Sequence, residues 1–249
     1  FDQSIDVSNR IQTFASNLAQ GIVLVGMAIL IAVGSRAALI VMIAIPTSFF
    51  IGIGFSYLTG YGLHQMTITG LIVALGLLVD NAIVVTESSV RFQKNGLIRN
   101  EAVIRGSTEV AWPMASSTLT TVLAFLPLVL MQGDSGDFLR SMPVTVIFTL
   151  TASLFVALTL TPLLSSRLLA QNYRETRFQI HIHELIETHY RRILDLCLAH
   201  RKMTLFLTVL SFGVSISLFP LVGLSLFPKA EKPQFLVDIE LPQGTHIST

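Results

Sequence analysis

The run of residues 68–86, ITGLIVALGLLVDNAIVVT, constrains this chain more than any other stretch, because it is apolar almost throughout. A helix of these 19 residues spans roughly 28 Å, about the thickness of the hydrocarbon core of a bilayer. The run contains one carboxylic acid, Asp80, followed directly by the amide Asn81. An ionisable side chain at that depth costs a few kcal/mol or more, and such residues usually belong to an ion or proton pathway. We therefore predict a functional role for Asp80, against the alternative of a structural polar residue bonded to Asn81 or to a threonine.

The composition favours a membrane protein over a soluble domain. Hydrophobic residues make up 52% of the chain and charged residues 12%, whereas soluble domains have about 25% charged residues. The single cysteine, Cys197, excludes an internal disulfide and a cysteine-based zinc site. The sequence has no glycine-rich phosphate loop, no Ser-His-Asp pattern and no nucleic-acid signature. We therefore predict neither an enzyme nor a nucleic-acid partner.

Hydropathy predicts an all-α polytopic membrane protein with six transmembrane helices. The first five form one transmembrane unit, residues 18–164, and the sixth stands apart from them. The six spans are expected at 18–34, 37–58, 68–86, 114–131, 144–164 and 203–222. Between them we expect turns at 59–67 and 131–143, and a polar link at 87–113 with a turn at Asn95-Gly96 and a short surface helix.

Three further segments lie outside these spans. Residues 1–17 predict an amphipathic lead-in helix, and residues 165–202 predict an amphipathic helix in the membrane interface, with an apolar stripe opposite its charges. After Pro228 apolar residues alternate with a period of two, so 228–249 is expected to begin a water-soluble domain with a β-strand. Because a lone strand is not stable, we expect the chain to be a fragment of a longer protein.

The basic residues predict the orientation of the helices. Of the 16 Lys and Arg residues, twelve fall in the links after the first, third and fifth spans, and four fall on the other side. The basic side is expected to face the cytoplasm. Both ends of the chain are then expected to be periplasmic.

Two residues accompany Asp80 and Asn81 as candidate site residues. Gly76 lies four residues before Asp80 on the same helical face and would let another helix approach the carboxylate. Glu87, seven residues after Asp80, lies on roughly the same face near the inner interface, as a secondary proton relay or as a solvated helix end. Asn81 is expected to hold Asp80 by a hydrogen bond without titrating itself.

A histidine-rich run, HIHELIETH at 181–189, looks like a metal motif without being one. The residue four after His183 is Glu187, whereas the zinc motif of metalloproteases has a histidine at both ends of that step. We therefore predict no metal site and expect these histidines to be solvated.

Four stretches resemble the resistance–nodulation–division (RND) exporters of the acriflavine-resistance, hydrophobe/amphiphile type. GLLVDNAIVVTES is similar to the fourth transmembrane helix of that family, and EVAWPMASSTLTTVLAFLPLVLMQGDSGDFLRSMPVTV to the next helix and the turn after it. VALTLTPLLSSRLL resembles the end of the following helix, and LFPKAEKPQFLVDIELPQGT resembles the start of the second periplasmic domain. The resemblance thus implies that 228–249 holds the first β-strand of a truncated periplasmic α+β domain. The resemblance covers essentially the whole chain, which would correspond to the second to seventh of twelve transmembrane helices.

The resemblance implies a proton-driven efflux antiporter of the bacterial inner membrane. Members of the family export amphiphilic compounds as homotrimers, use the proton motive force with no cofactor, and work with a periplasmic adaptor and an outer-membrane channel. Their proton site is a carboxylate pair in the fourth helix that faces a lysine from the second half of the protein. Here Asp80 matches the first acid, but Asn81 stands at the second position. Some family branches have this single-acid form, which leaves the number of protons per cycle open.

Two relatives of the same superfamily are alternatives. Five of the helices also resemble the sterol-sensing unit of eukaryotic receptors, and a protein-translocation motor has the same helix layout. The strand sequence at the end of the chain and the ASSTLTT segment favour the bacterial exporter.

The predicted orientation can be tested by cysteine accessibility in intact cells. With Cys197 replaced by serine, a cysteine introduced at Asn95 is expected to be cytoplasmic and to react with an impermeant thiol reagent only after permeabilisation. Labelling of that position in intact cells would show that the orientation is the reverse of the predicted one.

Overall fold

The computed structural model describes residues 3–63, 65–171 and 177–219. Its contacts divide the chain into two compact units, Phe1–Ile186 and Glu187–Thr249. The described residues form helices throughout, separated by short turns: α1 (Gln3–Ala32), α2 (Ser35–Leu58), α3 (Gln65–Lys94), α4 (Arg99–Val129), α5 (Asp134–Leu139), α6 (Ser141–Leu158), α7 (Leu160–Leu168), α8 (Arg177–Ala199) and α9 (Arg201–Leu218).

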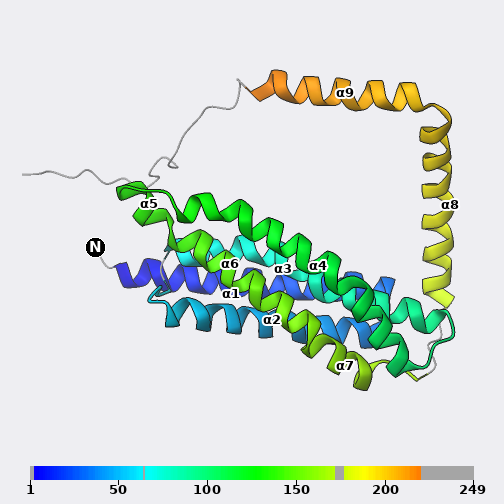
Figure 1. Cartoon of the computed structure of the whole chain (residues 1–249), viewed down its shortest axis with the longest axis horizontal. Helices are drawn as coiled ribbons and strands as arrows, with labels where there is room; N and C mark the ends of the chain where they lie inside the picture. The colour runs from blue at the N-terminus through cyan, green and yellow to red at the C-terminus, as the bar shows by residue number, and fades with distance from the viewer. Residues whose placement is uncertain (1–2, 64, 172–176, 220–249) are drawn as a thin grey trace, which may run out of the picture. The chain divides into compact units, whose positions relative to one another are not determined.

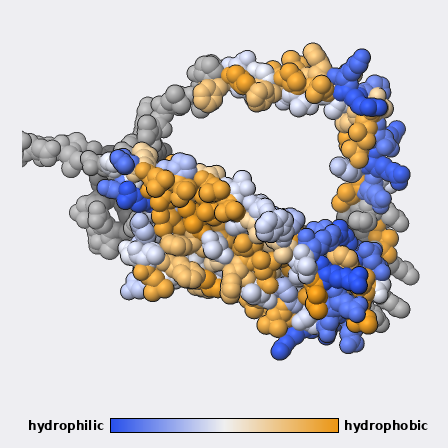
Figure 2. Space-filling model, in the orientation of Figure 1, coloured by the Kyte–Doolittle hydropathy of each residue, from blue (hydrophilic) through white to orange (hydrophobic). Residues whose placement is uncertain are grey.

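Among the described residues, six segments are long and apolar enough to cross a membrane, which agrees with the predicted number of spans. They are Ala15–Ala32, Ser35–Leu58, Gln65–Lys94, Arg99–Val129, Gly136–Leu168 and Arg201–Leu218. Many large apolar side chains point outward from these helices, among them Phe50, Trp112 and Phe155. Figure 2 shows hydrophobic residues along the visible face of the first unit and hydrophilic residues gathered towards its ends. Lipid tails would cover such a surface without the cost of exposing it to water.

The predicted polar link at 87–113 is wrong in its extent. α3 continues to Lys94 and α4 begins at Arg99, so the surface helix expected inside the link is the first part of α4. The predicted turn at Asn95-Gly96 is confirmed, because Gly96 has a φ of 91° and two backbone hydrogen bonds close the end of α3 around it. α4 runs on through Pro113, which removes one backbone donor but does not end a membrane helix whose neighbours pack against it.

The fifth predicted span is interrupted near its end. α6 ends at Leu158 and α7 begins at Leu160, with Thr159 between them at φ −119° and ψ −66°. Pro162 has no backbone N–H to donate to the carbonyl of Leu158, which explains a break at this point. The short helix α5 lies inside the turn predicted at 131–143. The predicted strand at 228–249 lies outside the described residues.

α6 is the helix around which the first unit is packed. It contacts α2, α3 and α4, and Figure 1 shows these helices running alongside one another. A stripe of small side chains, each at most 3% exposed, follows every fourth residue of α6 and continues into α7; this small-residue stripe consists of Ser141, Thr145, Thr149, Ser153, Ala157, Thr161 and Ser165. Successive members lie one turn apart, so the stripe forms a continuous row that winds slowly around the helix.

Two glycines bring neighbouring backbones close to α6. A Cβ atom on Gly52 of α2 would lie 2.8 Å from the Cα of Thr149. A Cβ atom on Gly70 of α3 would lie 2.6 Å from the carbonyl oxygen of Met142. Close approach through small residues is the usual mode of helix association in lipid. α6 is therefore held closely between α2 and α3.

The chain is buried where α7 ends, and three long polar side chains donate to the backbone carbonyls of its last residue and of the two residues after it. Leu169 is 2% exposed and packs with residues of α2, α3 and α4. Arg36 and Arg99 donate to the carbonyls of Leu168 and Leu169 at 3.5 and 3.2 Å. Gln93 donates to the carbonyl of Ala170 at 2.9 Å. These bonds supply the partners that the last carbonyls of a helix otherwise lack.

In the second unit, the end of α8 is joined to α9 by a hydroxyl. Thr204 Oγ1 donates to the carbonyl of Cys197 at 3.0 Å and to that of His200 at 3.2 Å. α8 is a helix in the segment where the sequence predicts one, and its described apolar side chains Tyr190 and Ile193 are exposed. Its place in a membrane interface stays a prediction.

The close approach of α2 to α6 can be tested with paired glycine substitutions. Gly52→Ala is expected to destabilise the protein by about 1 to 3 kcal/mol, because the added methyl group would overlap the backbone of Thr149. Gly54→Ala, two residues along the same helix, is the control, because no heavy atom lies within 4 Å of the added Cβ. Thermal unfolding in detergent would compare the two, and equal midpoints would contradict the close packing.

Candidate functional site

α3 has two opposite faces, one buried and one open. The buried face contains Leu71, Ala74, Leu78, Asn81 and Val85, each at most 9% exposed. Successive residues of a helix are about 100° apart, so the row through Gly76, Asp80 and Glu87 lies roughly opposite that face. These three predicted site residues are all exposed in the chain. The structure therefore brings them together on one side of α3, as the sequence predicts.

Asp80 lines a groove between α1 and α3. The groove has a volume of about 380 Å³, and Asp80 is the charged residue among otherwise apolar lining residues, which are Gly21, Val25, Ala28, Ile29, Leu75, Gly76, Val79 and Ile83. No heavy atom lies within 4 Å of where a Cβ of Gly76 would be. Gly76 therefore leaves the space beside the carboxyl group open to an approaching helix.

The groove continues towards the C-terminal end of α3. A second cavity of about 640 Å³ shares Ala28, Ile29 and Ile83 with the first, and Glu87 lines it together with Arg91 and Lys94. Glu87 is thus two turns from Asp80 along one open face, at the end where α3 becomes polar. This position agrees with both interpretations of Glu87, as a secondary relay and as a solvated helix end.

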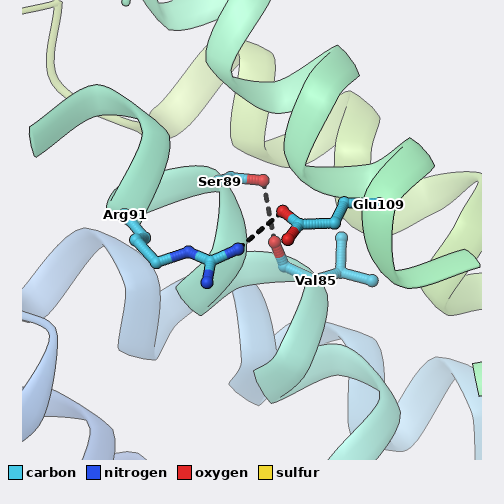
Figure 3. Close-up of polar contacts among 4 residues, drawn as sticks. All are labelled: Val85, Ser89, Arg91 and Glu109. Atoms are coloured by element: carbon cyan, nitrogen blue, oxygen red, sulfur yellow. Dashed lines mark hydrogen bonds and ion pairs between the residues drawn. The ribbon is translucent and has the colours of Figure 1, made fainter. Parts of the chain in front are cut away.

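Arg91, the basic residue nearest to Glu87 in sequence, pairs with α4. Its Nη2 lies 2.6 Å from Oε2 of Glu109, and both side chains are about half exposed (Figure 3). The two helices are close here, because a Cβ on Gly106 would lie 2.7 Å from the backbone nitrogen of Ser89. Ser89 in turn donates its hydroxyl to the carbonyl of Val85 at 2.7 Å (Figure 3). Within the part of the chain that the structure describes, no cation pairs with Asp80.

Asn81 lies on the buried face and does not contact the groove. Its Nδ2 donates to Oγ of Ser153 on α6 at 3.1 Å, and Ser153 Oγ donates to the carbonyl of Leu78 at 3.0 Å. The expected hydrogen bond from Asn81 to Asp80 is therefore wrong. Adjacent side chains of a helix point in different directions, so two neighbours rarely meet on one face.

Sequence reasoning missed Ser153 as part of the site. The signal was present in the four-residue spacing of small side chains from Ser141 to Ser165, all hydroxyls except Ala157, which places Ser153 on one helical face with its nearest neighbours in that series. Which helix that face touches could not be deduced from the spacing. The contact with Asn81 depends on the packing of α3 against α6.

Comparison with known proteins identifies one family profile and several related proteins that match most or all of this chain. A family profile described as the AcrB/AcrD/AcrF family matches residues 1–249. An uncharacterized transporter of Haemophilus influenzae is 31% identical over 99% of this chain, and the swarming motility protein SwrC of Bacillus subtilis is 32% identical over 79%. The multidrug resistance protein MdtC of Cronobacter sakazakii is 31% identical over 84%. The chain spans 24%, 19% and 21% of these three relatives, respectively.

Proposed function

The chain belongs to the AcrB/AcrD/AcrF family of RND transporters, and we propose that it is the proton-binding part of a multidrug efflux antiporter. In this proposal the whole protein is a secondary transporter that exports hydrophobic or amphiphilic compounds and uses the proton motive force with no cofactor. Asp80 is the group that takes a proton from the outer side and releases it to the cytoplasm in each cycle.

The position of Asp80 supports this role more than any other observation. Its side chain lies in an apolar groove that is open on one side, and no described cation neutralises it. A charged carboxylate in apolar surroundings is costly, whereas its protonated form is not. A group that binds and loses a proton with a large change in solvation energy can drive movement of the helices around it.

The second half of the full-length protein is proposed to supply the missing cation. The relatives are about four to five times longer than the part they share with this chain, so most of each one lies outside it. A cation opposite Asp80 would favour its charged form, and withdrawal of that cation would favour protonation. Movement of the second half towards and away from the α1–α3 groove would then couple proton transfer to the transport cycle.

The remaining properties of the whole protein follow from the same proposal. It would lie in the bacterial inner membrane, in contact with lipid, with both ends of this segment on the periplasmic side. It would act as a homotrimer with a periplasmic adaptor and an outer-membrane channel. Glu87 would be a secondary relay between Asp80 and the cytoplasm, through the continuation of the groove.

Replacement of Asp80 by asparagine tests the proposal in the full-length protein. Asp80→Asn should reduce proton-driven export of amphiphilic dyes to the level of cells without the protein, because the group can no longer change its charge. Folding and assembly should be largely unchanged, because the side chain keeps its size. Asn81→Asp should retain more export than Asp80→Asn. Normal export by Asp80→Asn, measured in energised vesicles, would make Asp80 a structural residue.

A substitution at Gly76 tests whether a helix of the second half occupies the groove. Gly76→Leu should abolish export, because its side chain would fill the space beside Asp80. Thermal unfolding of the described unit should change little, since nothing lies within 4 Å of the added Cβ. Gly54→Leu, at another open position, is the control and should retain export. Full export by Gly76→Leu would show that no helix approaches this side of α3.

A further inference from the structure

We propose that Ser153 of α6 is a positioning residue for Asp80, which it keeps in the groove by fixing the rotation of α3 about its own axis. This inference rests on the proposed role of Asp80 as the proton-binding group. Ser153 does not touch Asp80 and acts through two other points of α3, the side chain of Asn81 and the carbonyl of Leu78.

The hydrogen bonds of Ser153 are fully accounted for by α3. A serine hydroxyl has one proton to donate and can also accept. Here it donates to the carbonyl of Leu78 at 3.0 Å and accepts from Nδ2 of Asn81 at 3.1 Å. Ser153 is 2% exposed and Asn81 is 9% exposed, so water has little access to replace either bond. Because the proton of Ser153 is already committed, residue 81 must be a donor, and a neutral amide meets that requirement.

The two attachment points determine which way Asp80 faces. Leu78 and Asn81 are three residues apart and therefore lie on the same face of α3. Asp80 lies between them in sequence but points to the opposite side, into the α1–α3 groove. A rotation of α3 by one residue, about 100°, would break both bonds and carry Asp80 out of the groove.

Packing on either side keeps α6 close enough for this short side chain to reach α3. Gly70 brings the backbone of α3 against Met142, and Gly52 brings α2 against Thr149, one turn before Ser153. α6 contains no charged residue, and the charged residue of α2, Arg36, lies at its N-terminal end, while Asp80 faces away. The attachment is therefore made of neutral groups and persists whether Asp80 is charged or protonated.

A different serine of the same stripe provides a matched control. Ser141 is also on α6 and only 3% exposed, but its hydroxyl has no hydrogen-bond partner among the described residues. If Ser153 only fills space, Ser153→Ala and Ser141→Ala should have similar effects. If Ser153 positions α3, Ser153→Ala alone should change the surroundings of Asp80, and Ser153→Thr, which keeps the hydroxyl, should restore them.

The experiment is infrared difference spectroscopy on the full-length protein in lipid vesicles, between acidic and basic buffer. The carboxyl C=O band of protonated Asp80 is identified as the band missing from Asp80→Asn. In the wild type and in Ser141→Ala, one narrow band is expected to dominate, with a small second band beside it. In Ser153→Ala, the share of a second band is expected to rise about fivefold, the ratio that corresponds to the loss of one ordinary buried hydrogen bond.

The outcomes separate this inference from the proposed function. If no band depends on Asp80, Asp80 does not bind the proton, and the role of Ser153 fails with it. If the Asp80 band exists but is the same in Ser153→Ala and Ser141→Ala, only the positioning role is overturned. Asn81→Ala provides a second route, because it should split the band in the same way. Unfolding midpoints of Asn81→Ala, Ser153→Ala and the double variant should be non-additive, and additive values would also reject the attachment.

Discussion

The close contact of α6 with its neighbours is the constraint on which the rest of the described bundle depends. Lipid tails are as apolar as leucine side chains, so apolar surface alone does not favour one arrangement of helices over another in a membrane. Short distances between backbones do favour one arrangement, and such distances require small side chains on the facing surfaces. The small-residue stripe of α6 and α7, with Gly52 and Gly70 opposite its first part, meets that requirement. Larger residues here would separate the helices and remove the hydrogen bonds between them.

The same packing leaves one side of α3 available for function. α2, α4 and α6 cover the buried face of α3, which includes Leu78 and Asn81, while α1 covers only part of the opposite face. The open face contains Asp80 and, two turns later, Glu87. A helix that is packed closely on one side can hold a charged group on its other side at a defined depth in the membrane and in a defined direction. The position of Asp80 thus depends on residues that do not contact the groove.

The sequence was sufficient to predict the helices, because these depend on local hydropathy, while the role of Asp80 stays a prediction from the same pattern. The six spans follow from apolar length, and a lone carboxylic acid inside one of them is evident without any structure. Helix geometry separates Asn81 from Asp80 in direction, because successive side chains point about 100° apart, but which neighbouring helix Asn81 meets was not predictable. Polarity at residues 99–113 predicts a surface helix separate from the span that follows, whereas α4 runs through this stretch to Val129 as one helix. The break at Thr159 had a sequence signal in Pro162, but proline in a membrane helix does not always cause one.

Asn81 gives the single-acid form of this site a physical explanation. On α3 the buried position next to Asp80 faces a hydroxyl whose proton is already used by the carbonyl of Leu78. A carboxylate at position 81 could only accept a hydrogen bond, so it would compete for the proton of Ser153 or would have no donor. An amide can donate one of its own N–H groups to the hydroxyl oxygen instead. Asn81 therefore serves the attachment to α6 and leaves Asp80 as the one group within the span 68–86 that can change its charge. If Asp80 is the proton carrier, this span transfers at most one proton in each cycle, and any further proton must be carried by a group elsewhere, such as Glu87 at the inner end of the same groove.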